Sequence, residues 1–81
     1  MSGNELLKGF RNIKIALSDV KRGFEGIIVS VESRRLIEIG FVPGKKIRLV
    51  RKAPLRDPLQ VEIQGNHYII RKEEAKKVKV K

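Results

Sequence analysis

Residues 40–58, GFVPGKKIRLVRKAPLRDP, carry the turn and strand signals that decide the fold. The segment holds all three prolines, two of the seven glycines and six of the nineteen Lys and Arg residues. Its VPGK stretch, residues 42–45, predicts a type II turn, because Pro43 suits the second position of that turn and Gly44 the third. Residues 46–50 then alternate, with Ile47 and Leu49 on one face, which predicts a strand of a small β-barrel. The two prolines of the 53–58 loop end that strand.

Immediately before this segment, the apolar spacing changes from a strand period to a helix period. A short helix is expected at about residues 33–39, with the hydroxyl of Ser33 as its N-cap and Leu36 on its buried face. Gly40 stands where a helix end favours a left-handed residue, and Phe41 can supply the hydrophobic contact that accompanies such an end. With only about two turns, the helix depends on packing for its stability.

The N-terminal part of the chain predicts two further strands. Residues 13–20 alternate at first, with Ile13, Ile15 and Leu17 on one side, and form the expected first strand. A turn is expected at residues 21–23, and residues 25–31 predict the second strand.

The C-terminal part predicts a hairpin and a closing strand. Residues 59–64 alternate cleanly between apolar and polar and predict a strand. Residues 65–66 (GN) are a two-residue hairpin signal, so residues 67–71 are expected to form the second strand of the hairpin. Residues 72–76 predict a helical turn, and residues 77–81 predict a last strand. Five to six short strands with one brief helix predict a mainly β fold, a small barrel, since closure protects edges that so short a sheet leaves open.

Length and composition restrict the architecture and the location. With 81 residues the chain is expected to form a single domain at residues 13–81, preceded by an N-terminal extension at residues 1–12. There is no cysteine, so disulfides and thiolate metal sites are excluded. No apolar run approaches the roughly 18–20 residues that span a bilayer, and the first residues do not resemble a secretory signal. We therefore expect a cytoplasmic protein.

The net charge of +10 is large for this length. Such a field attracts polyanions, including nucleic acid, anionic lipid head groups and acidic protein surfaces. A solubilising surface rich in Lys, Arg and Glu explains the same composition, because the charges alternate with apolar residues along the predicted strands.

Few residues suggest chemistry. His67 is the only histidine, and with Glu62 it offers two weak candidate metal ligands on one outer face of the predicted hairpin. Two ligands do not make a site, so no metal, cofactor or catalytic residue is predicted. With one histidine beside a turn, no base is placed to activate a nucleophile, and we predict that the protein is not an enzyme.

A basic nucleic-acid-binding barrel is the alternative function. Six cations fall within twelve residues that contain no acid: Lys45, Lys46, Arg48, Arg51, Lys52 and Arg56. Small barrels that bind single strands also use exposed aromatic rings, on which bases stack. The aromatic residues are limited to Phe10, Phe24, Phe41 and Tyr68, and the first three adjoin glycines or apolar stretches typical of structural positions.

Three segments, in order, resemble the FeoA family. They are LSDVKRG at 17–23, RRLIEIGFVPGKKIRLVRKAPLRDP at 34–58 and VEIQGNHYIIRKEEAKKVKV at 61–80. The family motifs are the helix-ending glycine, the proline-glycine turn and the alanine-proline…aspartate-proline loop. Positions that match them are Gly40, Pro43, Gly44, Ala53, Pro54, Asp57 and Pro58.

The resemblance implies an SH3-like barrel and a non-enzymatic accessory or regulatory role in ferrous iron uptake. The implied partner is the cytosolic side of a FeoB-type transporter, with recruitment to the inner face of the cell membrane. We place the partner contact in the 53–58 loop, which comprises Ala53, Pro54, Leu55, Arg56, Asp57 and Pro58.

The chain departs from the family at three places, one of which is a shorter segment between Val31 and Arg34. Arg56 stands where the family usually has glycine, and a left-handed backbone there costs a side chain roughly 1–2 kcal/mol. The N-terminal extension adds Leu6, Leu7 and Phe10, which are expected either to rest on the barrel or to form a contact used in self-association or partner docking.

Overall fold

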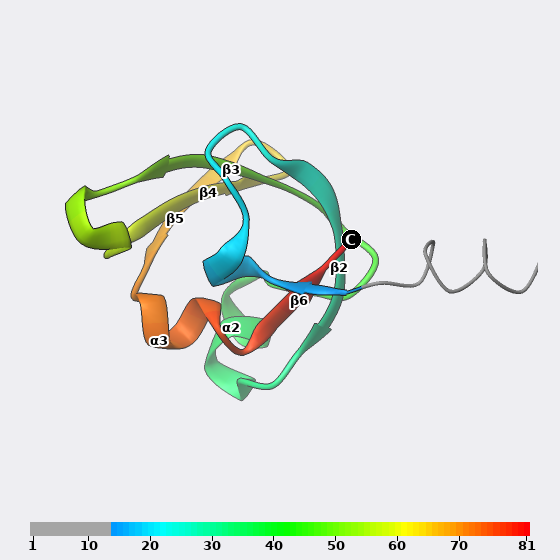
Figure 1. Cartoon of the computed structure of the whole chain (residues 1–81). Helices are drawn as coiled ribbons and strands as arrows, with labels where there is room; N and C mark the ends of the chain where they lie inside the picture. Colours follow the sequence, from blue (N-terminus) through cyan, green and yellow to red (C-terminus); the bar gives the residue numbers. More distant parts are fainter. Residues whose placement is uncertain (1–13) are drawn as a thin grey trace, which may run out of the picture.

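The computed structural model describes residues 14–81, which form one antiparallel sheet with short helical segments. The strands lie in the order β1-β6-β2-β3-β4-β5. Figure 1 shows the sheet curling around the core, with α2 and α3 below it. This arrangement confirms the predicted small, mainly β barrel. The elements are β1 (Ile15–Ala16), η1 (Leu17–Asp19), β2 (Glu25–Val31), α2 (Arg34–Ile39), β3 (Lys46–Lys52), η2 (Pro54–Arg56), β4 (Leu59–Ile63), β5 (Asn66–Ile70), α3 (Lys72–Ala75) and β6 (Val78–Val80).

Alternating strands fill the core as their patterns predict. Ile47 and Leu49 of β3 are buried, and every second residue of β4 and β6 is buried as well. Each of these three strands therefore gives one face to the barrel interior and the other to solvent. The buried apolar residues are Leu17, Val20, Ile28, Leu36, Phe41, Ile47, Leu49, Leu59, Val61, Ile63, Ile70, Ala75, Val78 and Val80.

The predicted first strand is wrong in its length. Only Ile15 and Ala16 pair with β6, and the chain then turns into the one-turn η1. Leu17 is buried as expected, but Ile15 is exposed. The alternation of the sequence ends where the strand ends, because the 3₁₀ turn rotates Leu17 toward the core without a continuing ladder.

The hairpin between β4 and β5 lies one residue earlier than predicted. Its two loop residues are Gln64 and Gly65, both with positive φ (51° and 83°), and Ile63 pairs with Asn66. Positive φ at both central positions is the type I′ arrangement, which matches the twist of the flanking strands. The QG pair, and not the GN pair, forms the turn, so the partner of each β5 residue lies two positions earlier in β4 than expected: His67 pairs with Glu62 instead of Gln64.

The helix α2 ends in the manner that its sequence predicts. The Ser33 side chain accepts a hydrogen bond from the Leu36 amide, which caps the start of the helix. At the other end, Gly40 has φ of 133°, and the Phe41 amide donates to the Leu36 carbonyl at 2.9 Å. The Phe41 ring is fully buried and packs against the ring of Tyr68, with centroids 5.3 Å apart. This contact ties the helix end to β5.

The predicted type II turn that follows the helix also forms. Gly44 has φ of 95°, and the Lys45 amide donates to the Val42 carbonyl at 3.2 Å. The turn directs the chain into β3, which pairs with β2 on one side and β4 on the other. Beyond β3 the chain enters the 53–58 loop.

Candidate functional site

The 53–58 loop projects from the barrel between β3 and β4, at the left of Figure 1. Its base is closed by the Ala53 amide, which donates to the Pro58 carbonyl at 3.0 Å. A single tight turn within it is closed by the Arg56 amide, which donates to the Ala53 carbonyl at 2.8 Å. The loop is therefore a compact, hydrogen-bonded feature and presents a defined tip.

The tip of the loop is formed by Leu55 and Arg56, which both have left-handed backbone angles. Their φ values are 66° and 64°. A left-handed conformation brings Cβ close to the carbonyl oxygen and disfavours residues other than glycine, asparagine and aspartate. The Leu55 side chain is also 93% exposed. An apolar side chain is thus presented to solvent on a strained backbone.

Replacing Arg56 by glycine is expected to raise the free energy of unfolding by about 0.5–1 kcal/mol. Glycine removes a left-handed penalty of roughly 1–2 kcal/mol but loses more conformational entropy on folding. Urea denaturation followed by circular dichroism measures the difference. Arg56→Ala is the matched control, since it removes the same charge and retains Cβ. Equal stabilities of the glycine and alanine variants would contradict a strained Arg56.

Two hydrogen bonds connect the ends of the loop to distant parts of the chain. Asp57 Oδ1 accepts from the Lys72 amide at the start of α3, at 3.0 Å. On the other side, Lys52 Nζ donates to the Ser18 carbonyl of η1 at 3.3 Å. Sequence reasoning missed both contacts, because they join residues 15 and 34 positions apart without a local signal.

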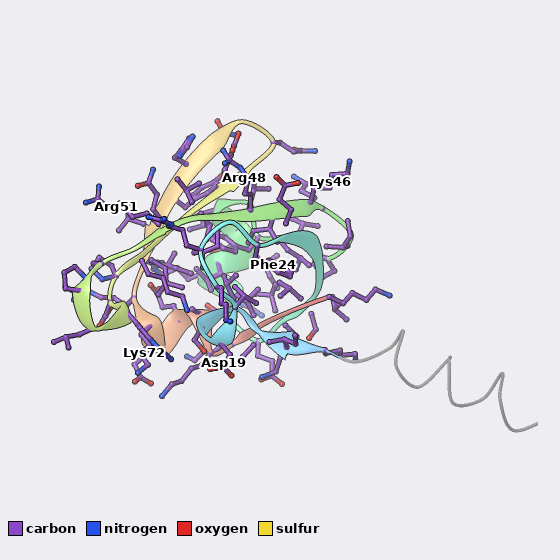
Figure 2. All side chains as sticks on the ribbon, turned by 45° about the horizontal axis from the view of Figure 1, so that its top comes forward. Asp19, Phe24, Lys46, Arg48, Arg51 and Lys72 are labelled. Carbon is purple, nitrogen blue, oxygen red and sulfur yellow. The ribbon has the colours of Figure 1, made fainter. Side chains whose placement is uncertain are left out.

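The flank of the loop is cationic. Burial lowers the pKa of the Lys52 ammonium from its ordinary value, and the charge of Arg56 lowers it further. Asp19 opposes this shift, while Lys72 adds to it. Within residues 14–81, none of these three cations forms an ion pair. Figure 2 shows Lys72 and Asp19 on one side of the molecule, with Arg48 and Lys46 on the other. The loop is thus flanked by positive charge that Asp19 only partly balances.

Glu62 and His67, the two candidate metal ligands, lie directly opposite each other across β4 and β5. The expected partner of His67 was Gln64, and the earlier turn corrects that register. Glu62 Oε1 accepts from Arg48 Nη2 and, at 3.0 Å, from Arg48 Nε. This hydrogen bond holds the pKa of the Glu62 carboxyl below its ordinary value. His67 Nδ1 lies 3.0 Å from Gln60 Nε2.

Both candidate ligands are therefore engaged in a cross-strand network on the outer face of the sheet. Glu62 is bound to a guanidinium, whose charge opposes a metal cation at the same oxygen. In the part of the chain that the structure describes, no three His, Cys, Asp or Glu side chains are grouped closely enough to hold a metal ion.

The aromatic residues within residues 14–81 do not provide a stacking surface for bases. Phe41 is fully buried, and Phe24 and Tyr68 are packed against the core. One cation of the basic segment, Arg48, is paired with Glu62. Single-strand binding by a small barrel combines a basic groove with accessible rings. The arrangement thus disfavours the nucleic-acid alternative. Phe10 lies outside the described residues.

Residues 15–81 match the family model of the FeoA domain. The chain belongs to the FeoA family. The match covers all the strands described above and includes the 53–58 loop. Among the described residues of this FeoA-family chain, no helix is both long and apolar enough to cross a membrane.

Relatives of known name agree with this assignment. A Porphyromonas gingivalis protein that fuses Fe(2+) transport protein A with the Fe(2+) transporter FeoB is 42% identical over 69 residues, which cover 79% of this chain and 8% of the relative. The FeoA-family chain therefore spans only a small part of that fusion protein. The match links its family to ferrous iron transport.

Solved FeoA structures share the fold. The FeoA protein of Chlorobium tepidum is 35% identical, with a TM-score of 0.74 over 82% of this chain and 68% of the other. FeoA of Stenotrophomonas maltophilia, a prokaryotic SH3-domain protein solved in complex with zinc, is 33% identical, with a TM-score of 0.74 over 83% and 89%. The SH3-like barrel implied by the resemblance is thus confirmed.

Three predictions remain untested by these observations. The domain boundary near residue 13 and the self-association surface at Leu6, Leu7 and Phe10 lie outside the described residues. The assignment of partner contact to the 53–58 loop also stays a prediction, which the geometry of the loop supports.

Proposed function

We propose that this chain is a non-enzymatic accessory subunit of ferrous iron uptake that binds the cytosolic side of a FeoB-type transporter through the 53–58 loop. One observation carries the proposal: Leu55 is 93% exposed on a left-handed backbone. Strained backbone conformations cluster at functional sites, where the surrounding structure holds them in place. An exposed leucine at such a site is well suited to insertion into an apolar pocket on another protein.

The energetics of the loop support this role. Left-handed backbone at Leu55 and Arg56 costs roughly 1–2 kcal/mol for each residue. Within residues 14–81 the Leu55 side chain gains no burial that offsets this cost. Burial of a leucine side chain in a complex contributes about 1.5–3 kcal/mol. Binding therefore provides the stabilisation that the isolated barrel lacks.

The charge around the loop indicates the chemistry of the partner surface. Lys52 and Lys72 lie at the base of the loop and Arg56 lies at its tip, and none of the three forms an ion pair among the described residues. Carboxylates at the rim of the partner's pocket would complement these cations, increase the association rate and select the register of docking. The net charge of +10 also favours approach to the anionic inner face of the cell membrane, where the transporter is embedded.

The fusion relative supports the choice of partner. In that protein, Fe(2+) transport protein A and the transporter FeoB are parts of one chain. A covalent connection keeps the two at a high effective concentration. A separate FeoA-family chain reaches the same contact by binding, which requires a surface such as the 53–58 loop.

The test is a titration of the isotope-labelled full chain with the soluble cytosolic domain of its FeoB partner, followed by amide shifts. We expect shifts to cluster at residues 53–58 and at the adjoining Lys52 and Lys72, which the loop contacts or faces electrostatically. The amides of α2, on a different side of the barrel, should move little.

Two outcomes would contradict the proposal. No shifts at partner concentrations of several hundred micromolar would place the Kd near or above about 1 mM and exclude direct docking to that domain. Shifts confined to α2 or to the outer face of β3 would assign docking to another surface. A duplex or single-stranded oligonucleotide in the same experiment tests the nucleic-acid alternative, whose affinity would fall steeply with salt.

A further inference from the structure

The strand β5 forms a free edge of the sheet. It pairs with β4 alone, at the end of the strand order β1-β6-β2-β3-β4-β5. Its sequence is NHYII, which contains no Lys, Arg, Asp or Glu, although 35% of the chain is charged. The other described strands of three or more residues each contain at least one charge. Natural proteins usually protect such edges with lysine, proline or a bulge, and β5 has none of these.

The register identifies the backbone groups that point away from the sheet. The two-residue turn makes Ile63 and Asn66 a hydrogen-bonded pair. Hydrogen-bonded pairs alternate with non-bonded pairs along an antiparallel ladder, so His67 and Ile69 direct their amides and carbonyls away from β4. No backbone hydrogen bond outside the ladder involves either residue within the described part of the chain. Two donors and two acceptors are therefore available at this edge.

The side chains at the same positions are accessible. Ile69 is 67% exposed, and His67 is exposed beside Gln60. Tyr68 and Ile70 instead face the core, where Tyr68 packs against Phe41. Within residues 14–81, the edge thus presents unpaired backbone amides and carbonyls together with one large apolar side chain, Ile69, on the outer face.

We propose that β5 binds an extended, acidic segment of another protein, which adds to the sheet as a further strand. Strand addition uses main-chain hydrogen bonds for affinity and alternate side chains for specificity. The acidic character follows from charge: the chain carries +10, and Arg71 directly follows β5. A second copy of the chain is a poorer occupant, since β5–β5 pairing would bring two +10 molecules together.

This site is distinct from the loop to which FeoB binding is assigned. The 53–58 loop is proposed to bind FeoB through the Leu55 side chain and the flanking cations, whereas β5 would bind its partner through the backbone groups of His67 and Ile69. The two proposals can fail separately, because the following experiment uses a peptide in place of FeoB.

Hydrogen exchange of the free chain is the first measurement. The amides of Tyr68 and Ile70, which bond to β4, are expected to exchange at least about tenfold more slowly than those of His67 and Ile69. Equally slow exchange at all four positions would mean that the edge is already covered, and would overturn the proposal.

A peptide titration is the second measurement. The probe is a blocked nine-residue peptide in which glutamate alternates with valine, and its control alternates lysine with valine. We expect the glutamate peptide alone to shift the β5 amides and to slow exchange at His67 and Ile69. Equal binding of both peptides, or of neither at millimolar concentration, would overturn the acidic-strand proposal. Doubling of the molecular mass without peptide, with protection at β5, would identify a second copy as the occupant and also overturn it.

Ile69→Pro is the decisive variant, because it removes an amide that points away from β4 and leaves the ladder bonds of Tyr68 and Ile70 in place. It should weaken glutamate-peptide binding at least about tenfold. Ile69→Val, which retains the amide, should bind as the unmodified chain does, and Leu55→Asp should also bind the peptide normally. Retention of full affinity by Ile69→Pro would refute backbone pairing at this edge.

Discussion

Replacing Leu55 by aspartate is expected to weaken binding to the cytosolic domain of the FeoB partner about 30-fold or more. Leu55 is the most exposed large apolar side chain of residues 14–81 and stands at the tip of the 53–58 loop. Central anchors of interfaces typically cost 2 kcal/mol or more when they are removed, which corresponds to roughly 30-fold in Kd. The introduced carboxylate would also meet the acidic rim proposed for the partner. Isothermal titration calorimetry measures the loss.

The fold should survive this substitution. The Leu55 side chain is almost fully solvated, and aspartate tolerates left-handed backbone better than leucine does. Ile37→Asp on α2 is the matched control, since it places the same charge at another exposed apolar position. Unchanged binding by Leu55→Asp, or an equal loss in Ile37→Asp, would show that the loop is not the specific contact.

Replacing Phe41 by alanine is expected to lower the free energy of unfolding by about 3–5 kcal/mol. Phe41 is fully buried, its amide bonds the Leu36 carbonyl, and its ring packs against Tyr68. The substitution therefore leaves a cavity where the end of α2 meets β5. Natural domains have a total stability of only about 5–15 kcal/mol, so a large part of this small domain's margin would be lost. Urea denaturation monitored by circular dichroism measures the change.

Phe41→Leu is the companion variant and keeps most of the buried volume. It should cost less than about 1.5 kcal/mol, and it remains measurable if the alanine variant does not fold. A loss below about 1 kcal/mol for Phe41→Ala would mean that the junction collapses around the missing ring.

Local sequence signals predicted much of the fold because their causes lie within a few residues. Ser33 caps α2, Gly40 ends it, and Gly44 forms the turn before β3. Each depends on a hydroxyl or a backbone angle of the residue itself. The family's glycine left two possibilities at Arg56, a left-handed backbone or a reshaped loop, and the backbone there is left-handed, with φ of 64°.

The hairpin turn was mispredicted because two adjacent residue pairs carry the same turn signal. Both QG and GN satisfy the composition of a two-residue turn, and the alternation of residues 59–64 fits either one. The structure selects QG, which places Glu62 opposite His67. Both turns place Ile70 on the buried face of the hairpin, opposite either Leu59 or Val61, so the burial pattern does not distinguish them.

The sequence alone determined a small, mainly β barrel of the FeoA family, with one capped helix and a proline-bounded loop after β3. Periodicity, turn chemistry and motif order are properties of neighbouring residues, so they are visible without coordinates. Only the tertiary structure decided that Leu55 projects into solvent, that Lys52 and Lys72 flank the loop, and that β5 is an open, uncharged edge. These features depend on contacts between residues far apart in the chain, such as Lys72 with Asp57, and on which strand has a neighbour. Long-range contacts and strand order are properties of the folded chain, so the preferences of neighbouring residues do not determine them.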